Sequence, residues 1–395
     1  MNQTKDITEA HHLQMYKRYP ITLVKGEGVC VYDDEGKVYI DALAGIAVNT
    51  LGHSHPKLVS AIQQQAEKLI HISNLYYNEP QARLAKLLTE YAQMDKVFFC
   101  NSGAEANEGA VKLARKYAHV HKKEGPIISV DNCFHGRTLG TIALGKSKYQ
   151  TGFTPMPEGF LQTDFHDLEA IEKAAKDGAI AVMLEPIQGE GGIYPHENSY
   201  LEKLREICDA HDMLLIFDEV QCGIGRTGKN FAFHHTNIKP DLLTSAKALG
   251  GGFPIGAVLC SEKVGNALNY GEHGTTYGGN PLGCAAAEAV IKTVLEDNLA
   301  SHAHAVGERI KAYVNDLAKT HSFIKEIRGK GLMLGIQLDM DGAPVVVEMM
   351  KRGVLANCTA GHTIRLVPPL IITETEMRKV IDCLIESVKS VKNVK

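Results

Sequence analysis

Six short apolar segments recur between residues 96 and 261, and stretches with helical spacing separate them. The segments are KVFFCN, PIISVDN, AVMLEP, LLIFDEV, DLLTSA and GAVLCS. Continuous apolar runs of this length fit strands that are buried on both faces, and the intervening helices supply the two covering layers. The alternation therefore predicts an α/β fold with a mostly parallel central sheet.

The chain has 395 residues, too many for one ordinary hydrophobic core, so we expect two domains. The first fifty residues suggest an extended arm followed by short strands, with a hairpin around the turn DDEG. Near the C-terminus, KEIRGKGLMLGIQLD and TIRLVPPLII read as further strands among helices. We predict an arm and part of a small domain in residues 1–50, a large α/β domain in 51–285, and the rest of the small domain in 286–395.

Composition excludes several classes of partner. Apolar residues make up 44 % of the chain and charged residues 22 %, which is the balance of a globular protein. The net charge of −4 and the pI of about 6.5 give no basic field for nucleic acid or an anionic membrane. No apolar run approaches the ~20 residues of a membrane span.

Nine cysteines are spread through the chain, and none forms a C-x-x-C pair. Such scattered thiols fit a reducing compartment. The first twenty residues lack the apolar region of a signal peptide, so we expect a cytoplasmic protein. The HSH and HVH triplets have no further ligand at suitable spacing, so we expect no metal site.

In an open parallel sheet, ligands bind beyond the carboxyl ends of the strands, so the residues that follow each strand are the candidates. KVFFC is followed by NSGAEANE, where Ser102 and Glu105 have the spacing of a capping box at a helix start. Gly103 and Ala104 carry little side chain and leave the first helical N–H groups open to a phosphate. An ordinary capped helix has the same pattern, so this motif alone leaves both interpretations open.

The next strand exits bring an aromatic ring, a guanidinium and carboxylates. Phe134 and Arg137 follow PIISVDN and suit a flat ligand with a carboxylate, although a core ring and a surface cation would look the same. Glu185 and Glu190 lie around IQGEGG, among glycines.

The stretch LLIFDEVQCGIGRTGKN has two interpretations. Gly223, Gly228 and Lys229 nearly spell a phosphate-binding P-loop. Residue 230 is Asn, however, where a P-loop has the Ser or Thr that holds magnesium, and the loop begins several residues beyond the strand. The stretch is better explained as a buried strand that ends in the carboxylate of Asp218.

Lys247 lies just after the strand DLLTSA and before a run of glycines. A lysine among apolar neighbours needs a partner or a chemical role, because burying its charge is costly. A phosphate cradle, an aromatic ring, a buried acid, a lysine and a carboxylate clamp together match pyridoxal phosphate, whose chemistry needs a Schiff-base lysine and an acid at the pyridine nitrogen.

On these residues the chain resembles the class III, fold type I pyridoxal-phosphate aminotransferases, and among them the acetylornithine aminotransferases. The resemblance covers nearly the whole chain through eight blocks: GIAVNTLGHSHP, NSGAEANE, FHGRT, EPIQGEGG, DEVQCGIGRTGK, TSAKALGGGFPIGA, HGTTYGGNPL and IRLVPPL. It implies a mostly parallel central sheet with a smaller α+β domain made from both chain ends, and a homodimer with shared active sites.

The resemblance also implies roles for individual residues. Lys247 and Asp218 match the catalytic lysine and the acid at the ring nitrogen, Gln221 a contact of the ring hydroxyl, and Phe134 the stacking ring. The other implied cofactor contacts are Ser102, Gly103 and Ala104 at the phosphate, Glu219 and Val220 beside the acid, and Thr276, which reaches the phosphate of the partner subunit.

Four residues are implied to bind the substrates. Arg137 matches the arginine that grips the carboxylate of the acylated amino acid, and Thr275 lines the substrate pocket. Arg365 matches the clamp for the α-carboxylate of 2-oxoglutarate or glutamate, and Glu190 the acid that pairs with Arg365 while the other substrate is bound.

The resemblance also bears on substrate choice, through the position of Gly45. Ornithine aminotransferases have a tyrosine at this place that recognises a free α-amino group, so glycine favours an acylated amine such as N2-acetyl-L-ornithine. Succinylornithine, 4-aminobutyrate and related ω-amino donors remain alternatives, and an aminomutase is disfavoured because it has little use for the Arg365–Glu190 switch. Cys222, where the family often has threonine, has no assigned consequence.

Overall fold

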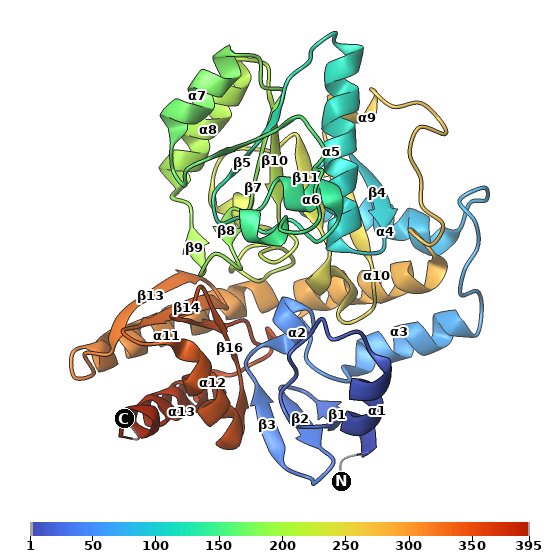
Figure 1. The fold of residues 1–395 in the computed structure, drawn as a ribbon. Helices are drawn as coiled ribbons and strands as arrows, with labels where there is room; N and C mark the ends of the chain where they lie inside the picture. The colour runs from blue at the N-terminus through green and yellow to red at the C-terminus, as the bar shows by residue number, and fades with distance from the viewer. Residues whose placement is uncertain (1–2, 394–395) are drawn as a thin grey trace.

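A seven-stranded sheet lies at the centre of the computed structural model, which describes residues 3–393 (Figure 1). In spatial order its strands are β4 (Lys96–Cys100), β12 (Gly256–Cys260), β11 (Leu242–Ser245), β10 (Leu214–Asp218), β7 (Ala181–Leu184), β5 (Ile127–Val130) and β6 (Phe160–Thr163). Neighbouring strands are parallel except at β12, which is antiparallel to β4 and β11. The six apolar segments are all strands, and the α/β fold class is confirmed.

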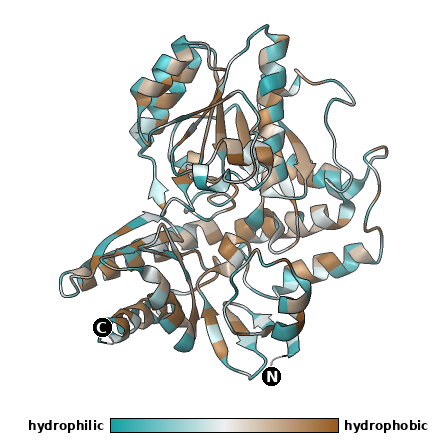
Figure 2. Ribbon diagram, in the orientation of Figure 1, coloured by the Kyte–Doolittle hydropathy of each residue, from teal (hydrophilic) through white to brown (hydrophobic). Residues whose placement is uncertain are grey.

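Alternate strand residues pack against opposite helical layers, because successive side chains of a strand point to opposite faces. In β10, Leu214 and Ile216 cluster with α5 (Gly103–Val120), while Leu215 and Phe217 cluster with the helices of the other face. Those helices are α4 (Glu79–Ala92), α7 (Leu168–Lys176), α8 (Asn198–Ala210) and α10 (Pro281–Glu296). Figure 2 shows the hydrophobic strands between these layers.

Shorter elements connect the layers and border the carboxyl edge of the sheet. They are α6 (Leu139–Ala143), η1 (Ser147–Tyr149), β8 (Ile187–Gln188), β9 (Tyr194–Pro195), η2 (Ala232–His235), η3 (Lys247–Gly250) and α9 (Glu262–Gly265).

Residues from both chain ends build two smaller sheets, drawn in blue and red at the bottom of Figure 1. The first contains β1 (Leu23–Glu27), β2 (Cys30–Asp33), β3 (Val38–Asp41) and β15 (Val354–Leu355). The second contains β13 (Ile324–Lys330), β14 (Met333–Leu338), β17 (Thr363–Leu366) and β16 (Asn357–Thr359). The hairpin expected at DDEG is formed by β2 and β3, and β15 pairs in parallel with β3. Three helices pack beside these sheets: α11 (Leu299–Ala318), α12 (Gly342–Lys351) and α13 (Glu374–Asn393). Helix α3 (Pro56–Ala66) packs against α10.

The N-terminal arm is not wholly extended. It starts with α1 (Gln3–His11), which has no buried residue and whose Lys5 and Glu9 form an i,i+4 ion pair. Local helix-forming contacts, rather than burial, therefore shape this segment, and the prediction of an extended arm is wrong there.

An unusual turn, α2 (Ala44–Ala47), precedes α3. The φ angle is positive at Ala44, Gly45, Ile46 and Ala47, with values of 49°, 64°, 66° and 61°. Left-handed backbone costs roughly 1–2 kcal/mol for each non-glycine residue, so surrounding contacts must hold this turn in place. It packs against η3, which begins at Lys247.

Among residues 3–393, no helix is long and apolar enough to cross a membrane.

Candidate active site at the carboxyl edge of the sheet

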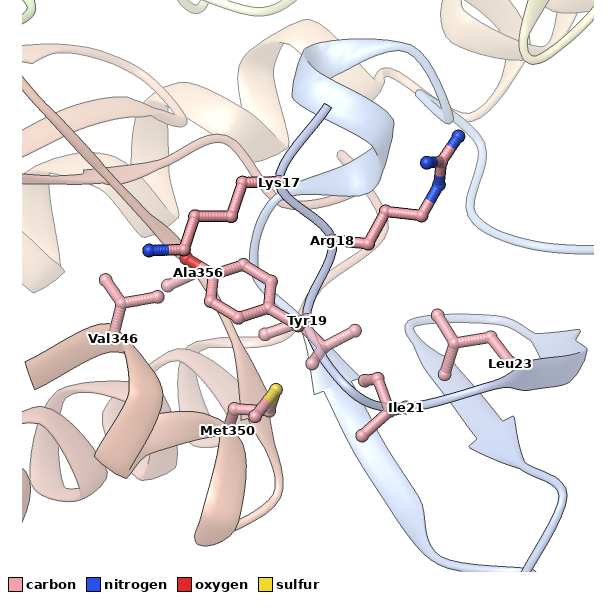
Figure 3. A pocket seen from close by; sticks show the side chains of 9 residues that line it. Lys17, Arg18, Tyr19, Ile21, Leu23, Val346, Met350 and Ala356 are labelled. Atoms are coloured by element: carbon pink, nitrogen blue, oxygen red, sulfur yellow. The ribbon is translucent and has the colours of Figure 1, made fainter. Parts of the chain in front are cut away.

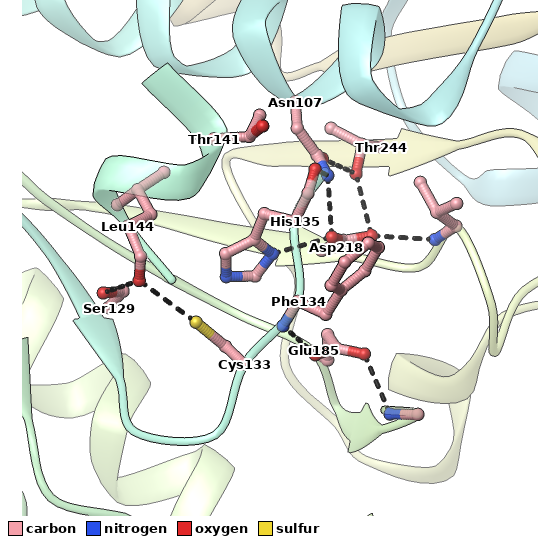
Figure 4. A network of polar contacts seen from close by, with 12 residues as sticks. Asn107, Ser129, Cys133, Phe134, His135, Thr141, Leu144, Glu185, Asp218 and Thr244 are labelled. Atoms are coloured by element: carbon pink, nitrogen blue, oxygen red, sulfur yellow. Dashed lines mark hydrogen bonds and ion pairs between the residues drawn. The ribbon is translucent and has the colours of Figure 1, made fainter. Parts of the chain in front are cut away.

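Asp218 ends β10, and several donors converge on its carboxylate (Figure 4). Asn107 Nδ2 and His135 Nδ1 lie 2.8 and 2.7 Å from Oδ2, and the Val220 N–H donates to Oδ1 at 3.0 Å. Thr244 Oγ1 donates to Asn107 Oδ1 at 2.7 Å and lies 3.4 Å from Asp218 Oδ1. The carboxylate is thus fixed in orientation and buried, yet it keeps acceptor capacity at Oδ1 for another donor.

His135 stands behind this carboxylate, with Nε2 buried and without a hydrogen-bond partner in the described chain. Burial disfavours a charge on the ring, but the adjacent Cys133 sulfur and the hydrogen-bonded Asp218 raise the pKa of His135 well above its ordinary value. The His135 ring thus fixes one oxygen of the acid at the strand end, while its own Nε2 faces a buried space.

The turn after β4 opens α5 as expected. Ser102 Oγ accepts a hydrogen bond from the Glu105 N–H at 3.1 Å. Glu105 reaches one residue further back than a capping box requires and accepts from the N–H of Asn101 at 2.8 Å. The first N–H groups of the helix have no intrahelical acceptor. A Cβ at Gly103 would lie 2.7 Å from Val220, so Val220 closes tightly over this turn.

Lys247 begins η3 with φ at 43° and is partly buried. Burial and the charge of Arg365 lower the pKa of Lys247, although Glu190 and Asp218 act in the opposite direction. A lowered pKa increases the fraction of neutral amine, the form that attacks a carbonyl or accepts a proton.

Arg365 on β17 is fully buried, and Glu190 is its acid partner. Arg365 Nη1 donates to Glu190 and also to Gln221 Oε1 at 3.2 Å, and Nε donates to Asn357 Oδ1 at 3.1 Å. Burial alone would raise the pKa of Glu190, but the charge and hydrogen bond of Arg365 lower it. The structure therefore brings the predicted clamp, switch and ring-hydroxyl contact together.

Phe134 and Arg137 lie with Tyr149 at another side of the site. The rings of Phe134 and Tyr149 are 5.7 Å apart, and the Arg137 guanidinium lies 4.0 Å from the centre of the Tyr149 ring. Within residues 3–393, Arg137 has no carboxylate partner, so its donors remain available to an anion.

Thr275 and Thr276 lie on the loop between α9 and α10. Thr275 Oγ1 accepts a hydrogen bond from Asn101 at 3.1 Å, next to the α5 turn, and Thr276 is exposed. The partner-subunit contact of Thr276 stays a prediction.

Glu219 points into the fold instead of toward the strand end. Its carboxylate accepts from the N–H groups of Ala232 and Phe233 at 2.5 and 2.8 Å. Burial raises the pKa of Glu219 to about 7. The cofactor contact implied for Glu219 stays a prediction, and its side chain already has a structural partner. Cys222 Sγ lies 3.6 Å from the same carboxylate.

Sequence reasoning assigned no role to Asn107, His135, Thr244 or Glu185, which all lie at this edge of the sheet. Asn107 could have been found from the sequence, because a polar amide among alanines and glycines on the buried face of a helix needs a hydrogen-bond partner. No group of three or more potential metal ligands occurs in the described part of the chain.

A separate cavity of about 390 Å³ lies between the N-terminal arm and α12 (Figure 3). It is lined by Lys17, Arg18, Tyr19, Ile21, Leu23, Val346, Met350, Leu355 and Ala356, and includes none of the predicted site residues.

Comparisons with known proteins agree with one another. The family described as aminotransferase class-III matches residues 13–388. An acetylornithine aminotransferase of Methanocaldococcus jannaschii is 50 % identical, with 98 % of each chain covered. The same-named protein of Caldanaerobacter subterraneus is 49 % identical, with 94 % of this chain and 95 % of that protein covered.

The fold of this chain is also similar to those of solved structures. An ornithine aminotransferase of Toxoplasma gondii has a TM-score of 0.95 at 34 % identity, covering 99 % of this chain and 96 % of that one. An acetylornithine aminotransferase of Elizabethkingia anophelis has a TM-score of 0.87 at 36 % identity, covering 98 % of both chains.

Proposed function

The chain belongs to the class-III aminotransferases, and we propose that it transfers the terminal amino group of N2-acetyl-L-ornithine to 2-oxoglutarate. The products are N-acetyl-L-glutamate 5-semialdehyde and L-glutamate. The reaction is reversible, and in arginine biosynthesis it runs toward acetylornithine.

The observation that carries this proposal is the Arg365–Glu190 pair beside Lys247. An enzyme that alternates between two substrates in one site needs a carboxylate clamp that can be covered and uncovered. A buried arginine whose acid partner is one-quarter exposed fits this requirement, since solvent reaches the Glu190 side chain but not that of Arg365. The named relatives supply the choice of acetylornithine as the amino donor.

The residues present fit pyridoxal phosphate, the cofactor of this family. The helix start at Ser102 offers unpaired N–H groups to a phosphate, and Asp218 keeps acceptor capacity for a ring nitrogen. Phe134 follows β5 and Gln221 follows β10 at the same edge of the sheet, and Lys247 supplies the amine. When bound, the cofactor supplies a carbonyl for amines and a ring that accepts the electrons of a cleaved Cα–H bond.

The chain's own residues hold and move protons around that chemistry. Asp218, fixed by Asn107 and His135, presents a negative charge where the ring nitrogen would carry its proton. Lys247 has a lowered pKa and acts as nucleophile and then as the base that carries the proton between carbon atoms.

The two arginines divide the carboxylates between them. Arg137, stacked on Tyr149 and lacking an acid partner in the described residues, binds the carboxylate of the acylated donor. Arg365 binds the α-carboxylate of 2-oxoglutarate once Glu190 has moved aside, and Glu190 returns when the donor occupies the site.

An ornithine aminotransferase is the second candidate, because such enzymes are also close in fold. Gly45 disfavours it, since this turn offers no polar side chain to a free α-ammonium group.

We also propose a homodimer in a reducing, cytoplasmic compartment. Large apolar side chains are exposed on two segments, 69–77 and 270–277, and the second contains Thr275 and Thr276. Such a patch favours burial against a second copy. All nine cysteines are free.

A donor test separates these functions. The purified enzyme with pyridoxal phosphate is mixed with acetylornithine, succinylornithine, ornithine or 4-aminobutyrate, without an acceptor, and the visible band of the cofactor is followed. Fast bleaching by acetylornithine alone, reversed by 2-oxoglutarate, is the expected result. Bleaching only by ornithine or 4-aminobutyrate would contradict the proposed substrate.

A further inference from the structure

Glu185 is a buried carboxylate that the mechanism above does not use. It follows β7 directly, and only 4 % of the residue is exposed. Burial and the nearby charge of Asp218 raise the pKa of Glu185 to about 7. Keeping a carboxyl group here is therefore costly, and its position needs an explanation.

The two oxygens of Glu185 join two loops. Oε1 accepts a hydrogen bond from the Phe134 N–H and Oε2 from the Gly189 N–H, both at 2.9 Å (Figure 4). A second bond, from Gln188 Nε2 to the carbonyl of Asp131 at 2.7 Å, joins the same loops. The loop after β5 and the loop after β7 are thus connected at the level of the site.

Each loop carries residues that face the site. Phe134 lies on the first, and Gly189 and Glu190 on the second. A Cβ at Gly189 would lie 2.5 Å from Gln221, so this backbone sits directly against the side chain that accepts from Arg365. A shift of the Gly189 backbone would therefore displace the side chain of Gln221 and the neighbouring residue Glu190 together.

We propose that Glu185 is a positioning residue that holds the stacking ring of Phe134 in register with Gln221 and the Glu190 switch. It acts through the N–H groups of Phe134 and Gly189 and touches neither substrate nor cofactor. This inference rests on the proposed function, because the positioned groups are those assigned to the cofactor and to 2-oxoglutarate.

The test compares Glu185→Gln with Asp241→Asn. Gln keeps one acceptor oxygen but places an amide donor against an N–H group, so one loop is released. Asp241 is also a buried carboxylate that accepts a backbone N–H, from Leu215 at 2.9 Å, but it lies at the opposite end of β11. Loss of stability alone would affect both variants.

In Glu185→Gln we expect a ~10-fold weaker affinity of the apoenzyme for pyridoxal phosphate and an altered visible circular dichroism of the bound cofactor. The KM for 2-oxoglutarate should rise more than kcat falls, and amide hydrogen exchange in segments 131–135 and 187–191 should accelerate. Asp241→Asn should show none of these changes. If Glu185→Gln does not fold, Glu185→Asp, which is too short to reach both N–H groups, takes its place.

Unchanged cofactor affinity and dichroism in the Glu185 variant would overturn the inference, as would equal changes in Asp241→Asn. A wild-type enzyme that binds the cofactor but does not react with acetylornithine would contradict the proposed substrate. The role of Glu185 would then be tested by comparing the circular dichroism of the bound cofactor in wild type and variant. If wild type bound no cofactor, both proposals would fail.

Discussion

Substituting Glu190 by glutamine should make the enzyme bind 2-oxoglutarate more tightly. A carboxylate binds arginine best through two parallel bonds, and Arg365 Nη1 is engaged by Glu190 in the structure. The acceptor must therefore displace Glu190 before it can use both nitrogens of the guanidinium.

The size of the effect follows from the bond that is displaced. A hydrogen bond to a charged group contributes about 1.5–3 kcal/mol, and a neutral one about 0.5–1.5 kcal/mol. Glutamine at position 190 should therefore lower the displacement cost by about 1–1.5 kcal/mol, which corresponds to a roughly 5- to 13-fold lower KM for 2-oxoglutarate. Because the pKa of Glu190 is lowered, the wild-type carboxylate persists, and the difference should hold between about pH 6 and 8.

Steady-state kinetics with varied 2-oxoglutarate at saturating acetylornithine give the measurement. Glu326→Gln is the matched control, since Glu326 pairs at 3.0 Å with another buried arginine, Arg328, that has no assigned substrate. A KM that rises or stays constant in Glu190→Gln would refute the displacement argument.

Three further predictions follow from single residues. Lys247→Ala should lower the transamination rate at least ~100-fold and remove the visible band of covalently held cofactor, as measured by absorbance; a retained band would refute the role of Lys247. Gly45→Tyr should lose roughly 1–2 kcal/mol in urea unfolding, because φ is 64° there, and an unchanged midpoint would show that the turn carries no strain. Burial, with His166 nearby, lowers the pKa of His196 to about 3, so the unfolded chain takes up a proton first and stability falls as pH drops below about 6.5. Wild type should thus lose roughly 2 kcal/mol more than His196→Phe between pH 7 and 5, and parallel melting curves would exclude this role.

The sheet was predictable because its strands are continuous apolar runs. Asp218 and Lys247 were identified as candidate site residues because they lie at the ends of two of these runs. The partners of Asp218 were not predictable from spacing. Asn107, His135 and Thr244 follow or sit on different elements, and only the strand order brings them to one carboxylate. The same holds for Glu185, whose two carboxylate oxygens accept N–H groups from its own loop and from the loop after β5.

The left-handed turn α2 was also not predictable from the sequence. Gly45 is the one residue in it that adopts positive φ without a steric penalty, while Ala44, Ile46 and Ala47 give no local signal for that conformation. The helix α1 was missed for a different reason, since it packs no apolar face and shows no periodic stripe.

The pairing of β3 with β15 sets an order of events during synthesis of the chain. Lys37 Nζ donates a hydrogen bond to the carbonyl of Lys351, 314 residues later, just before β15. At ~5–20 residues per second, β3 waits roughly 15–60 s on the ribosome for its neighbour to emerge. During that interval the edge of β3 that β15 later covers stays unpaired, and an unpaired edge is where a sheet can pair with a wrong strand.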